Sequence, residues 1–597
     1  MLVSDFILNY LQKKKVKKVF LLTGGAIAFV VDAFSRNKKI TYISTAHEQA
    51  AAMMADAYSR LGPNLGATMV TSGPGATNLL TGIACSWFDS VPTMHICGQV
   101  NRYEQIGHVK STKHVRQVGF QETDIVSMSK PITKFSYRVK NENEIKYSLD
   151  KAYHISQSGR AGPVLLDIPM DIQRKKYDST KQKIFKIKSK VKKKYLILEK
   201  IKKIRNKLEN SKRPCMIIGG GIRLSKTNLE LKTLIKKLKI PVLTTWSGFD
   251  SVSYSNPYYI GSIGVYGSRA ANFTVQNSDF ILCLGSRLDT RITGGNPSKF
   301  ARAAYIAAID IDKNELNKSR GLNIDLKINC DLKYFFKFSK KLHTKPLLKN
   351  RNWLNLSKNW KHKYKSIQSD FYKDKKFVNP YIFMKKLSYF LSKNETIITD
   401  DGAHLTWTMQ GFEIKDGQRL FSSFGNSPMG YAFPAAIGAS IALNKKRIIC
   451  IDGDGSIQIN IQELHTMVNH KLPIKIFILN NNGYGIIKQF QELYLNKRYE
   501  ATGKGVSNPN FKDIANAYKI NYNLINNNNK INSVLKKVLN SNSAEFIEVM
   551  IRNNQKIIPK LSFGDPIEDL SPKVSRKEFK SNMIIDEVKK SNIIESN

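Results

Sequence analysis

The sequence predicts an α/β protein built from three doubly wound, parallel-sheet domains. Short apolar runs rich in β-branched residues alternate with helical patterns along most of the chain, and strands that alternate with helices favour parallel sheets. Several of these runs end in clusters of glycine and polar residues, as at 23–26 and 452–456. Because ligands of parallel sheets lie beyond the carboxyl ends of the strands, these clusters are the first candidates for a functional site.

Length and composition are those of a multi-domain globular protein. A chain of 597 residues with 42% hydrophobic content is too long for one core. No apolar run approaches the ~20 residues that span a membrane, and charges interrupt residues 1–15 where a signal peptide would be apolar. The six cysteines occur singly, without a Cys-x-x-Cys pair. The sequence therefore indicates neither a zinc site nor a disulfide framework, and a cytoplasmic location is expected.

The chain is strongly basic. Lys and Arg number 95 against 47 Asp and Glu, which gives a formal net charge of +48. Such a charge is typical of nucleic-acid binding. The lysines are spread widely, however, and no nucleic-acid-binding motif accompanies them. We interpret the excess as solvated surface and expect no nucleic-acid partner.

Residues 1–175 are predicted to form the first domain. Strands are expected at 19–22, 40–44, 67–70, 93–97 and 163–168, with helices at 50–61 and 79–87. Two strands run into small-residue turns, 23–26 and 71–78, and a third ends just before Glu48. Glu48 is either a surface carboxylate that caps the next helix or a ligand-binding group at the edge of the sheet.

Residues 195–345 are predicted to form the second domain, after a lysine-rich linker that ends in a helix near 196–208. Its strands are expected at 215–218, 241–245, 280–284 and 304–311. A triple glycine at 219–221 follows the first strand. Alone it is weak evidence for a dinucleotide site, because a tight turn needs the same residues.

Residues 375–560 are predicted to form the third domain, and the charged tail 561–597 is interpreted as a flexible arm over the surface. Within this domain, 448–485 has the pattern strand, tight turn, helix, strand and loop of a βαβ unit. Asp454 lies in its turn and Asn481 follows its second strand. Two hard oxygen ligands beside a glycine turn and a helix N-terminus suit a divalent cation and a diphosphate. The alternative, an acidic turn in which Asp454 caps the helix, is disfavoured by the asparagine pair that ends the next strand.

This pairing of Gly453-Asp454-Gly455 with Asn480-Asn481 resembles the motif of thiamine-diphosphate (TPP) enzymes. Over about residues 3–560 the chain resembles the catalytic subunit of acetohydroxyacid (acetolactate) synthase, most specifically at 120–124, 130–134 and 158–164. The resemblance implies a pyrimidine-binding domain, a central FAD- or nucleotide-binding domain of Rossmann type, and a domain that binds the diphosphate with Mg²⁺.

The resemblance assigns roles to residues of the first domain. Glu48 is expected to hydrogen-bond N1′ of the aminopyrimidine, which makes the 4′-nitrogen basic enough to take the C2 proton. Gln121 and Lys134 are expected to border the active-site cavity, and with Glu48 they are the catalytic candidates. The other cofactor contacts implied here are Gly25, Ala26, Pro74 and Asn78, and Arg160 is expected to contact FAD.

In the third domain the resemblance implies a magnesium site made by the side chains of Asp454 and Asn481 and the backbone carbonyl of Gly483. Met429 is expected to be the apolar wedge that keeps the two rings of the cofactor folded together. The remaining implied cofactor contacts are His404, Gly453, Gly455 and Ser456.

In the second domain, 264–267, 285–291 and 310–312 resemble the FAD-binding domain of acetolactate synthase. FAD in a non-redox role is therefore expected, with Gly267, Arg287 and Asp310 as contacts. Some relatives bind ADP, another nucleotide or nothing here, and Tyr266 stands where acetolactate synthases have histidine.

Other departures from the family concern the acceptor. The loop 101–119 is basic, and by our matching it is roughly ten residues longer than in the family. It leads directly into Phe120 and Gln121, and is either a solvated loop or an element that recognises a larger, anionic acceptor. Ala403 replaces a glutamine near the diphosphate, and Phe490 replaces a tryptophan that helps to select the incoming 2-oxo acid.

The sequence therefore predicts a TPP- and Mg²⁺-dependent carboligase that decarboxylates a 2-oxo acid, with pyruvate as the expected donor. In the first interpretation it forms 2-acetolactate for branched-chain amino-acid synthesis. In the second it transfers the two-carbon unit to another carbonyl acceptor, such as a keto-sugar nucleotide. A third, a basic binding protein on an inactive fold, predicts no thiamine binding. The resemblance also implies a homodimer or tetramer and leaves room for a small regulatory subunit.

Overall fold

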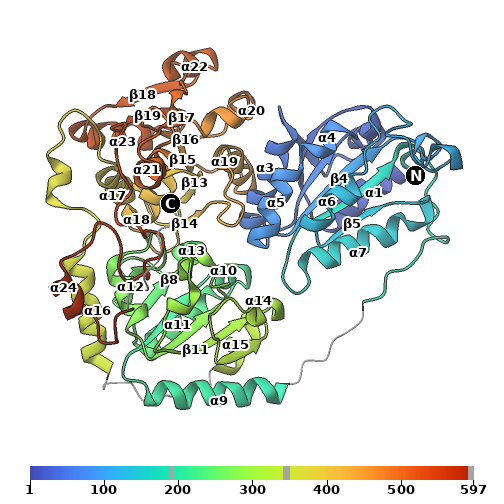
Figure 1. Cartoon of the computed structure of the whole chain (residues 1–597). Helices are drawn as coiled ribbons and strands as arrows, with labels where there is room; N and C mark the ends of the chain where they lie inside the picture. Colours follow the sequence, from blue (N-terminus) through green and yellow to red (C-terminus); the bar gives the residue numbers. More distant parts are fainter. Residues whose placement is uncertain (188–193, 340–349, 589–597) are drawn as a thin grey trace.

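The computed structural model describes residues 1–187, 194–339 and 350–588. They form three α/β domains, each built on a six-stranded sheet (Figure 1; blue to cyan, green, and yellow to red). Every strand pair of these three sheets is parallel. The predicted fold class is confirmed.

The N-terminal sheet has the order β2-β1-β3-β4-β6-β5. Its strands are β1 (Lys18–Leu22), β2 (Thr41–Ser44), β3 (Gly66–Val70), β4 (Thr93–Gln99), β5 (Phe135–Arg138) and β6 (Val164–Pro169). The helices that matter for the site are α3 (Glu48–Leu61), α4 (Pro74–Thr77), α5 (Leu80–Asp89) and α7 (Ile145–Gln157). Strand β4 is buried along its whole length, as expected of a parallel sheet covered on both faces.

The central sheet has the order β12-β11-β10-β7-β8-β9. Its strands are β7 (Pro214–Ile218), β8 (Val242–Thr244), β9 (Tyr259–Ser262), β10 (Phe280–Leu284), β11 (Tyr305–Asp310) and β12 (Leu326–Asn329). Helix α9 (Lys194–Asn210) leads into this domain, as the sequence predicted, and the linker segment 188–193 lies outside the described residues.

The C-terminal sheet has the order β14-β13-β15-β16-β19-β18. Its strands are β13 (Thr396–Thr399), β14 (Arg419–Phe421), β15 (Ile448–Gly453), β16 (Ile474–Asn480), β18 (Asn521–Ile525) and β19 (Glu545–Met550). Helices α18 (Ala403–Gly411), α19 (Ala432–Ala442), α20 (Glu463–Asn469) and α21 (Gly485–Tyr494) frame the carboxyl edge. Strands β15 and β16 are buried throughout.

The N- and C-terminal domains share one hydrophobic core. Helix α3, which is rich in alanine and methionine, packs against α19, and the side chains of both belong to the same buried cluster. Figure 1 shows the two helices side by side at the junction. This contact fixes the two predicted cofactor-binding domains relative to each other.

The tail is the clearest error of the sequence interpretation. Residues 561–588 are not a flexible arm, because Leu561, Ile567, Leu570 and Phe579 are buried in the core of the central domain. The carboxylate of Glu568, 1% exposed, accepts hydrogen bonds from Gln276 and Arg302. The prolines and charges of this segment led to the wrong interpretation, because the four apolar side chains that anchor it are scattered among them. Residues 589–597 lie outside the described part of the chain.

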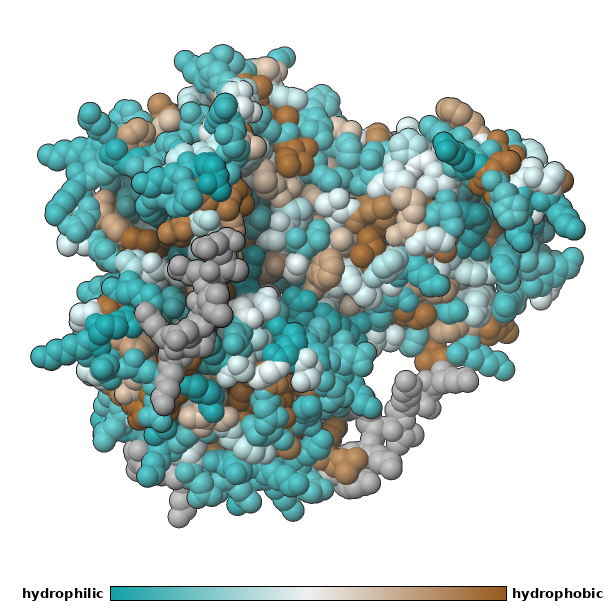
Figure 2. All heavy atoms as spheres, in the orientation of Figure 1, coloured by the Kyte–Doolittle hydropathy of each residue, from teal (hydrophilic) through white to brown (hydrophobic). Residues whose placement is uncertain are grey.

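The surface agrees with the composition. Figure 2 shows hydrophilic residues spread over all three domains on the face in view, with hydrophobic residues in small groups between them. Within the described ranges, none of the helices combines the length and the apolar character that crossing a membrane requires.

Candidate functional site

Glu48 lies at the amino end of α3, just beyond strand β2, and is 7% exposed. Its Oε2 accepts a hydrogen bond from Asn78 Nδ2 at 3.0 Å, and a Cβ at Gly75 would lie 3.3 Å from Oε1. The cap of α3 is His47, whose Nδ1 accepts the Gln49 N–H. Glu48 is thus neither a surface group nor the helix cap, and the interpretation as a ligand-binding group is the one that fits.

The two small-residue turns predicted as cofactor contacts lie side by side. Thr71 Oγ1 accepts the backbone N–H of Ala26 at 3.2 Å, which joins the turn 23–26 to the turn 71–78. No atom lies within 4 Å of the Cβ position of Gly25, and Pro74 at the start of α4 is exposed. The structure therefore brings Gly25, Ala26, Pro74 and Asn78 together around Glu48.

Gln121 reaches the same edge of the sheet. A Cβ at Gly73 would lie 2.9 Å from Gln121 Cβ, so the segment passes directly over the 71–78 turn. Gln121 has φ of 64°, a conformation that non-glycine residues seldom adopt. The carbonyl of Thr123 fixes the segment by accepting hydrogen bonds from Gln99 and Arg138.

Lys134 has different partners. Its ammonium group donates to the backbone carbonyls of Ile155 and Ser158 near the end of α7, and burial lowers its pKa to about 8. No hydrogen bond in the described chain joins it to Glu48 or Gln121. Its catalytic role stays a prediction.

The long loop 101–119 has a defined conformation. Glu122 accepts the backbone N–H groups of Ile106 at 2.7 Å and Val118 at 3.0 Å, so one carboxylate ties both ends of the loop. Arg102 is an anchor, paired with Asp171 at 2.7 Å. The exposed basic side chains are those of Lys110, Lys113 and Arg116, and His108 and His114 are exposed beside them. In the part of the chain that the structure describes, Lys110, Lys113 and Arg116 form no ion pair.

Asp454 lies just beyond strand β15 and is 2% exposed. Its Oδ2 accepts the backbone N–H of Gly483 at 2.9 Å and Asn508 Nδ2 at 2.7 Å. The helix expected immediately after the glycine turn is absent there: a 3-10 turn spans Ile457–Asn460, and α20 starts only at Glu463. Asp454 is therefore not a helix cap, and the expected helix dipole does not begin at this turn.

Asn481 follows β16 and is 6% exposed. Its Nδ2 is buried without a hydrogen-bond partner, and it would lie 2.6 Å from a Cβ at Gly485, so glycine is needed there. Asn553 donates to the carbonyl of Asn481 at 2.9 Å and holds the loop. Burial raises the pKa of Asp454, and a bound cation would oppose that cost. The set Asp454, Asn481 and Gly483 fits a divalent cation.

A second buried group lies beside the first. Asp400, His404 and Asp452 place ligand atoms within 4.8 Å of one another and could hold a metal ion. Asp400 is already occupied, since it accepts the N–H groups of Gly430 at 2.9 Å and Ala432 at 2.6 Å. Burial raises the pKa of Asp400 to about 7 and that of Asp452 well above its usual range. Because both carboxylate oxygens of Asp400 already accept backbone N–H groups, we favour the Asp454 set.

Met429 lies in a segment held from both sides. Asp400 fixes the residues after it, and Ser427 Oγ donates to Asp401 at 2.7 Å. Upstream, Asp89 of α5 accepts the N–H groups of Phe424 and Gly425. The predicted cofactor contacts of this domain are also closely packed. The side chain of His404 lies 2.7 Å from where a Cβ would stand at Gly453, and that of Tyr484 lies 2.4 Å from where a Cβ would stand at Gly455. Ser456 Oγ donates to the Asp401 carbonyl.

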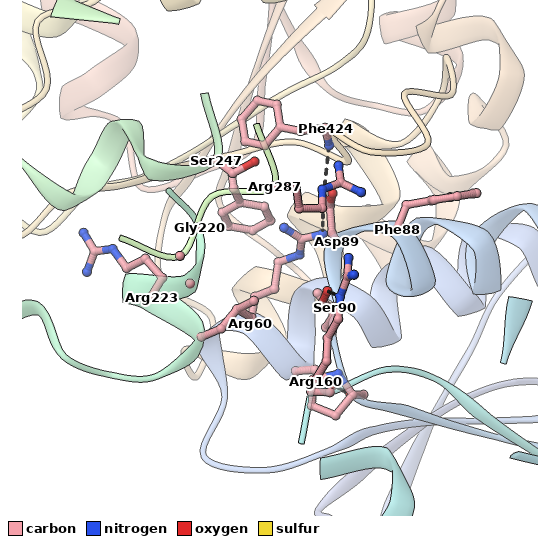
Figure 3. A pocket seen from close by; sticks show the side chains of 18 of the residues that line it. Arg60, Phe88, Asp89, Ser90, Arg160, Gly220, Arg223, Ser247, Arg287 and Phe424 are labelled. Carbon is pink, nitrogen blue, oxygen red and sulfur yellow. Dashed lines mark hydrogen bonds and ion pairs between the residues drawn. The ribbon is translucent and has the colours of Figure 1, made fainter. Parts of the chain in front are cut away.

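A separate cavity of about 470 Å³ opens where the three domains meet (Figure 3). Arg60, Arg160, Arg223, Arg287, Arg291, Arg419 and Lys333 line it, together with the turn glycines Gly220, Gly221 and Gly285. Asp310, whose pKa burial raises to about 6, also lines it, as predicted. This volume and cationic lining fit a nucleotide.

Gly267 is not among the lining residues but packs against Gly264 and Asn272. Tyr266 stacks on Trp246, with 5.8 Å between the ring centroids.

Several residues of these sites carried no signal in the sequence. Asn508 reaches Asp454 across 54 residues, and Asn553 reaches Asn481 across 72 residues. Asparagine is abundant throughout the chain, so neither position stands out. Asp400 follows the short apolar run 397–398 and stands beside Asp401 and close to His404 in the sequence, which was the one available hint.

Comparison with known proteins agrees with this geometry. Models of the thiamine pyrophosphate enzyme N-terminal TPP binding domain, central domain and C-terminal TPP binding domain match residues 1–128, 201–338 and 400–549. The acetolactate synthase large subunit of Cyanidium caldarium is 34% identical over 94% of each chain. The isozyme 2 large subunit of Escherichia coli K12 is 30% identical over 96% of this chain and 100% of its own. The chain belongs to the thiamine pyrophosphate enzyme family and resembles acetolactate synthase large subunits over its full length.

Proposed function

We propose that the protein is a TPP- and Mg²⁺-dependent carboligase that decarboxylates pyruvate and joins the two-carbon unit to a second carbonyl. The observation that carries the proposal is that the expected residues of both halves are buried just beyond strand ends: Glu48 accepts a hydrogen bond from Asn78, and Asp454 accepts the N–H of Gly483 in the loop that carries Asn481. Thiamine diphosphate, when bound, supplies the electron sink for loss of CO₂. The interpretation as an inactive binding protein is weakened because Glu48, Asp454 and Asn481 are all present and buried.

The chain's own residues would position and protect this chemistry. Glu48 would hydrogen-bond the aminopyrimidine, and Asp454, Asn481 and the Gly483 carbonyl would hold magnesium against the diphosphate. Met429 would support the folded cofactor, because Asp400 and Asp89 fix its segment on both sides. Gln121 would face the substrate from the turn above Gly73.

The first candidate product is 2-acetolactate, with pyruvate as both donor and acceptor; both relatives named above are acetolactate synthase large subunits. NMR of the products from pyruvate, TPP, Mg²⁺ and FAD tests this. Steady formation of 2-acetolactate supports the proposal; no consumption of pyruvate with any carbonyl acceptor would overturn it.

The second candidate is transfer to a different acceptor, such as a keto-sugar nucleotide. The observation in its favour is the loop 101–119, which Glu122 holds in shape. Its exposed Lys110, Lys113 and Arg116 form no ion pair with any residue that the structure describes. The same NMR experiment separates the candidates. Pyruvate turnover that stays slow until a phosphorylated ketone or aldehyde is added favours the second.

FAD in the three-domain cavity is part of the proposal. Arg160 is held there by Ser90, Asp312 and Glu315, and Arg287 points into the same space in Figure 3. Fluorescence titration with FAD and with ADP measures the preference. Saturable FAD binding that Arg287→Ala weakens supports the assignment, and equal binding by wild type and variant contradicts it.

We further propose a homodimer or tetramer in which one active centre takes Glu48 and the magnesium site from different copies. Within the described residues, no hydrogen bond or ion pair links Glu48 or Asn78 to Asp454 or Asn481. Phe120, which precedes Gln121, and Phe563, which stacks on Tyr494 of α21, are 86% and 72% exposed, and such exposed rings are typical of interaction surfaces. A small regulatory subunit and a cytoplasmic location remain predictions.

A further inference from the structure

One acidic side chain of the C-terminal domain touches the turn that carries Glu48. Glu463 is the first residue of α20 and is completely buried. Its Oε1 accepts the backbone N–H of Ala46 at 2.9 Å and that of His47 at 3.0 Å, across 417 and 416 residues of sequence. Its Oε2 accepts the hydroxyl of Thr466 at 2.7 Å.

These two amides belong to the connection between β2 and α3. The strand ladder ends at Ser44, and α3 begins at Glu48. Thr45 N–H still bonds to Leu21, and the Gln49 N–H is capped by His47. Of the three N–H groups in between, Glu463 accepts those of Ala46 and His47. Without it, both amides would lose their acceptor at the point where the chain turns into the helix.

We infer that Glu463 is a positioning residue that fixes the backbone of Ala46 and His47 and thereby aims the Glu48 carboxylate. This rests on the proposed role of Glu48 toward the aminopyrimidine. Glu48 is the next residue after His47, so a shift of the turn moves its Cα directly. A misplacement of about 1 Å costs roughly 100-fold in rate for a group that must meet its partner in a fixed geometry.

The contact does not depend on a negative charge. One oxygen makes both bonds to the turn, and a carboxyl or amide oxygen in the same place would accept them equally. The second oxygen meets a hydroxyl, which can reverse its role and accept from an amide nitrogen. Burial raises the pKa of Glu463, and its Oε1 remains an acceptor in either protonation state.

Two conservative variants separate the effect of side-chain length at position 463 from the effect of its charge. Glu463→Gln keeps the length and the acceptor but not the charge. Glu463→Asp keeps the charge but is shorter by one carbon–carbon bond, about 1.5 Å, and cannot reach the turn without moving α20. A positioning role predicts that Gln is tolerated and Asp is not. A role in proton transfer predicts the reverse.

The experiment combines hydrogen exchange with kinetics on the full-length protein. In the protein without cofactor or substrate, mass spectrometry of peptides covering 45–49 should show amide exchange at least tenfold faster in Glu463→Asp, and within threefold of wild type in Glu463→Gln. With TPP, Mg²⁺ and pyruvate, kcat should fall at least tenfold in Glu463→Asp and stay within threefold in Glu463→Gln.

Three outcomes would overturn the inference: unchanged exchange in Glu463→Asp, a loss of kcat in Glu463→Gln as large as in Glu463→Asp, or retained kcat in Glu463→Asp. Failure of the proposed function looks different, because the wild type itself would then be inactive while the exchange data still report the contact. If Glu463→Asp does not fold, the kcat of Glu463→Gln is the test: a kcat within threefold of wild type supports the inference, and a loss of activity contradicts it.

Discussion

The Oδ2 atom of Asp454 accepts the backbone N–H of Gly483 at 2.9 Å. This bond joins the end of β15 to the loop after β16, so the two predicted ligand clusters form one structure. Asn481 lies two residues before Gly483, in the loop that Asn553 holds. The arrangement is a preformed site for a divalent cation, with an acidic group, an amide and a glycine carbonyl.

The first prediction concerns the metal. Asp454→Asn should raise the Mg²⁺ concentration needed for half-maximal TPP binding by at least tenfold, because a charged oxygen ligand is lost. Calorimetric titration with TPP at a series of Mg²⁺ concentrations measures this. Asp452→Asn is the matched control: Asp452 is buried at the end of the same strand but belongs to the group with Asp400 and His404, so its Mg²⁺ requirement should change less than threefold. The opposite ranking would assign the metal to Asp400, His404 and Asp452.

The second prediction concerns the sharing of the active centre. Glu48→Gln and Asp454→Ala should each abolish turnover in their own homodimers. Mixed after reversible dissociation, the two variants should regain about a quarter of wild-type activity, because one centre of each mixed dimer then holds both intact residues. A mixture that stays inactive, while size-exclusion chromatography shows that the chains have exchanged, would mean that each centre lies within one chain.

The third prediction concerns the loop 101–119. Replacing Lys110, Lys113 and Arg116 by serine should raise the KM of a phosphorylated acceptor about tenfold, without changing TPP affinity. The free energy of unfolding should change by less than about 0.5 kcal/mol, since all three side chains are exposed. Serine at the exposed lysines Lys236, Lys512 and Lys577 removes the same charge elsewhere. If that control raises the KM equally, the effect comes from net charge and the loop has no specific role.

The fourth prediction uses a buried carboxyl in the N-terminal domain. Asp167 pairs with Arg138 at 2.7 Å, yet burial outweighs the pair and raises its pKa from 3.8 to about 6. Because the folded pKa lies above the unfolded one, the stabilising contribution is full below about pH 4 and is lost as the pH rises to about 6.

Relative to Asp167→Asn, the free energy of unfolding of the wild type should therefore fall by about 1.4 kcal/mol per pH unit between about pH 4 and 6. Urea unfolding of the cofactor-free proteins at several pH values measures the difference. Parallel pH profiles for the two proteins would show that Asp167 does not titrate in this range.

The sequence predicted most of the inner strands and missed most of the edge strands, although the edge strand β2 was predicted and the inner strand β19 was not. Strands β4, β15 and β16 are continuous apolar runs because both faces of a parallel sheet are covered. Strands β5 and β18 lie at sheet edges, are partly exposed and read as polar segments. The tail failed for a related reason: Ile567, Leu570 and Phe579 are isolated apolar residues with no period, and their burial depends on the shape of the central domain.

In the candidate site, too, the residues with a local sequence signal were predicted and those without one were not. Glu48, Asp454 and Asn481 could be found because each stands at the end of a recognisable strand, next to glycine or small residues. Asn508 and Glu463 could not, because their partners are distant in sequence and no local pattern marks them. Lys134 was assigned by resemblance alone, and its ammonium group bonds to two carbonyls of its own domain.

The measurement that tests the central claim most directly compares wild type with Glu48→Gln. Both should bind TPP with Mg²⁺ equally, because the diphosphate site is in the C-terminal domain. Pyruvate consumption, followed by NMR at saturating cofactor, should fall at least 100-fold in the variant, since a glutamine cannot favour the basic form of the aminopyrimidine. If Glu48→Gln binds TPP and still consumes pyruvate at the wild-type rate, the account of this active site is wrong.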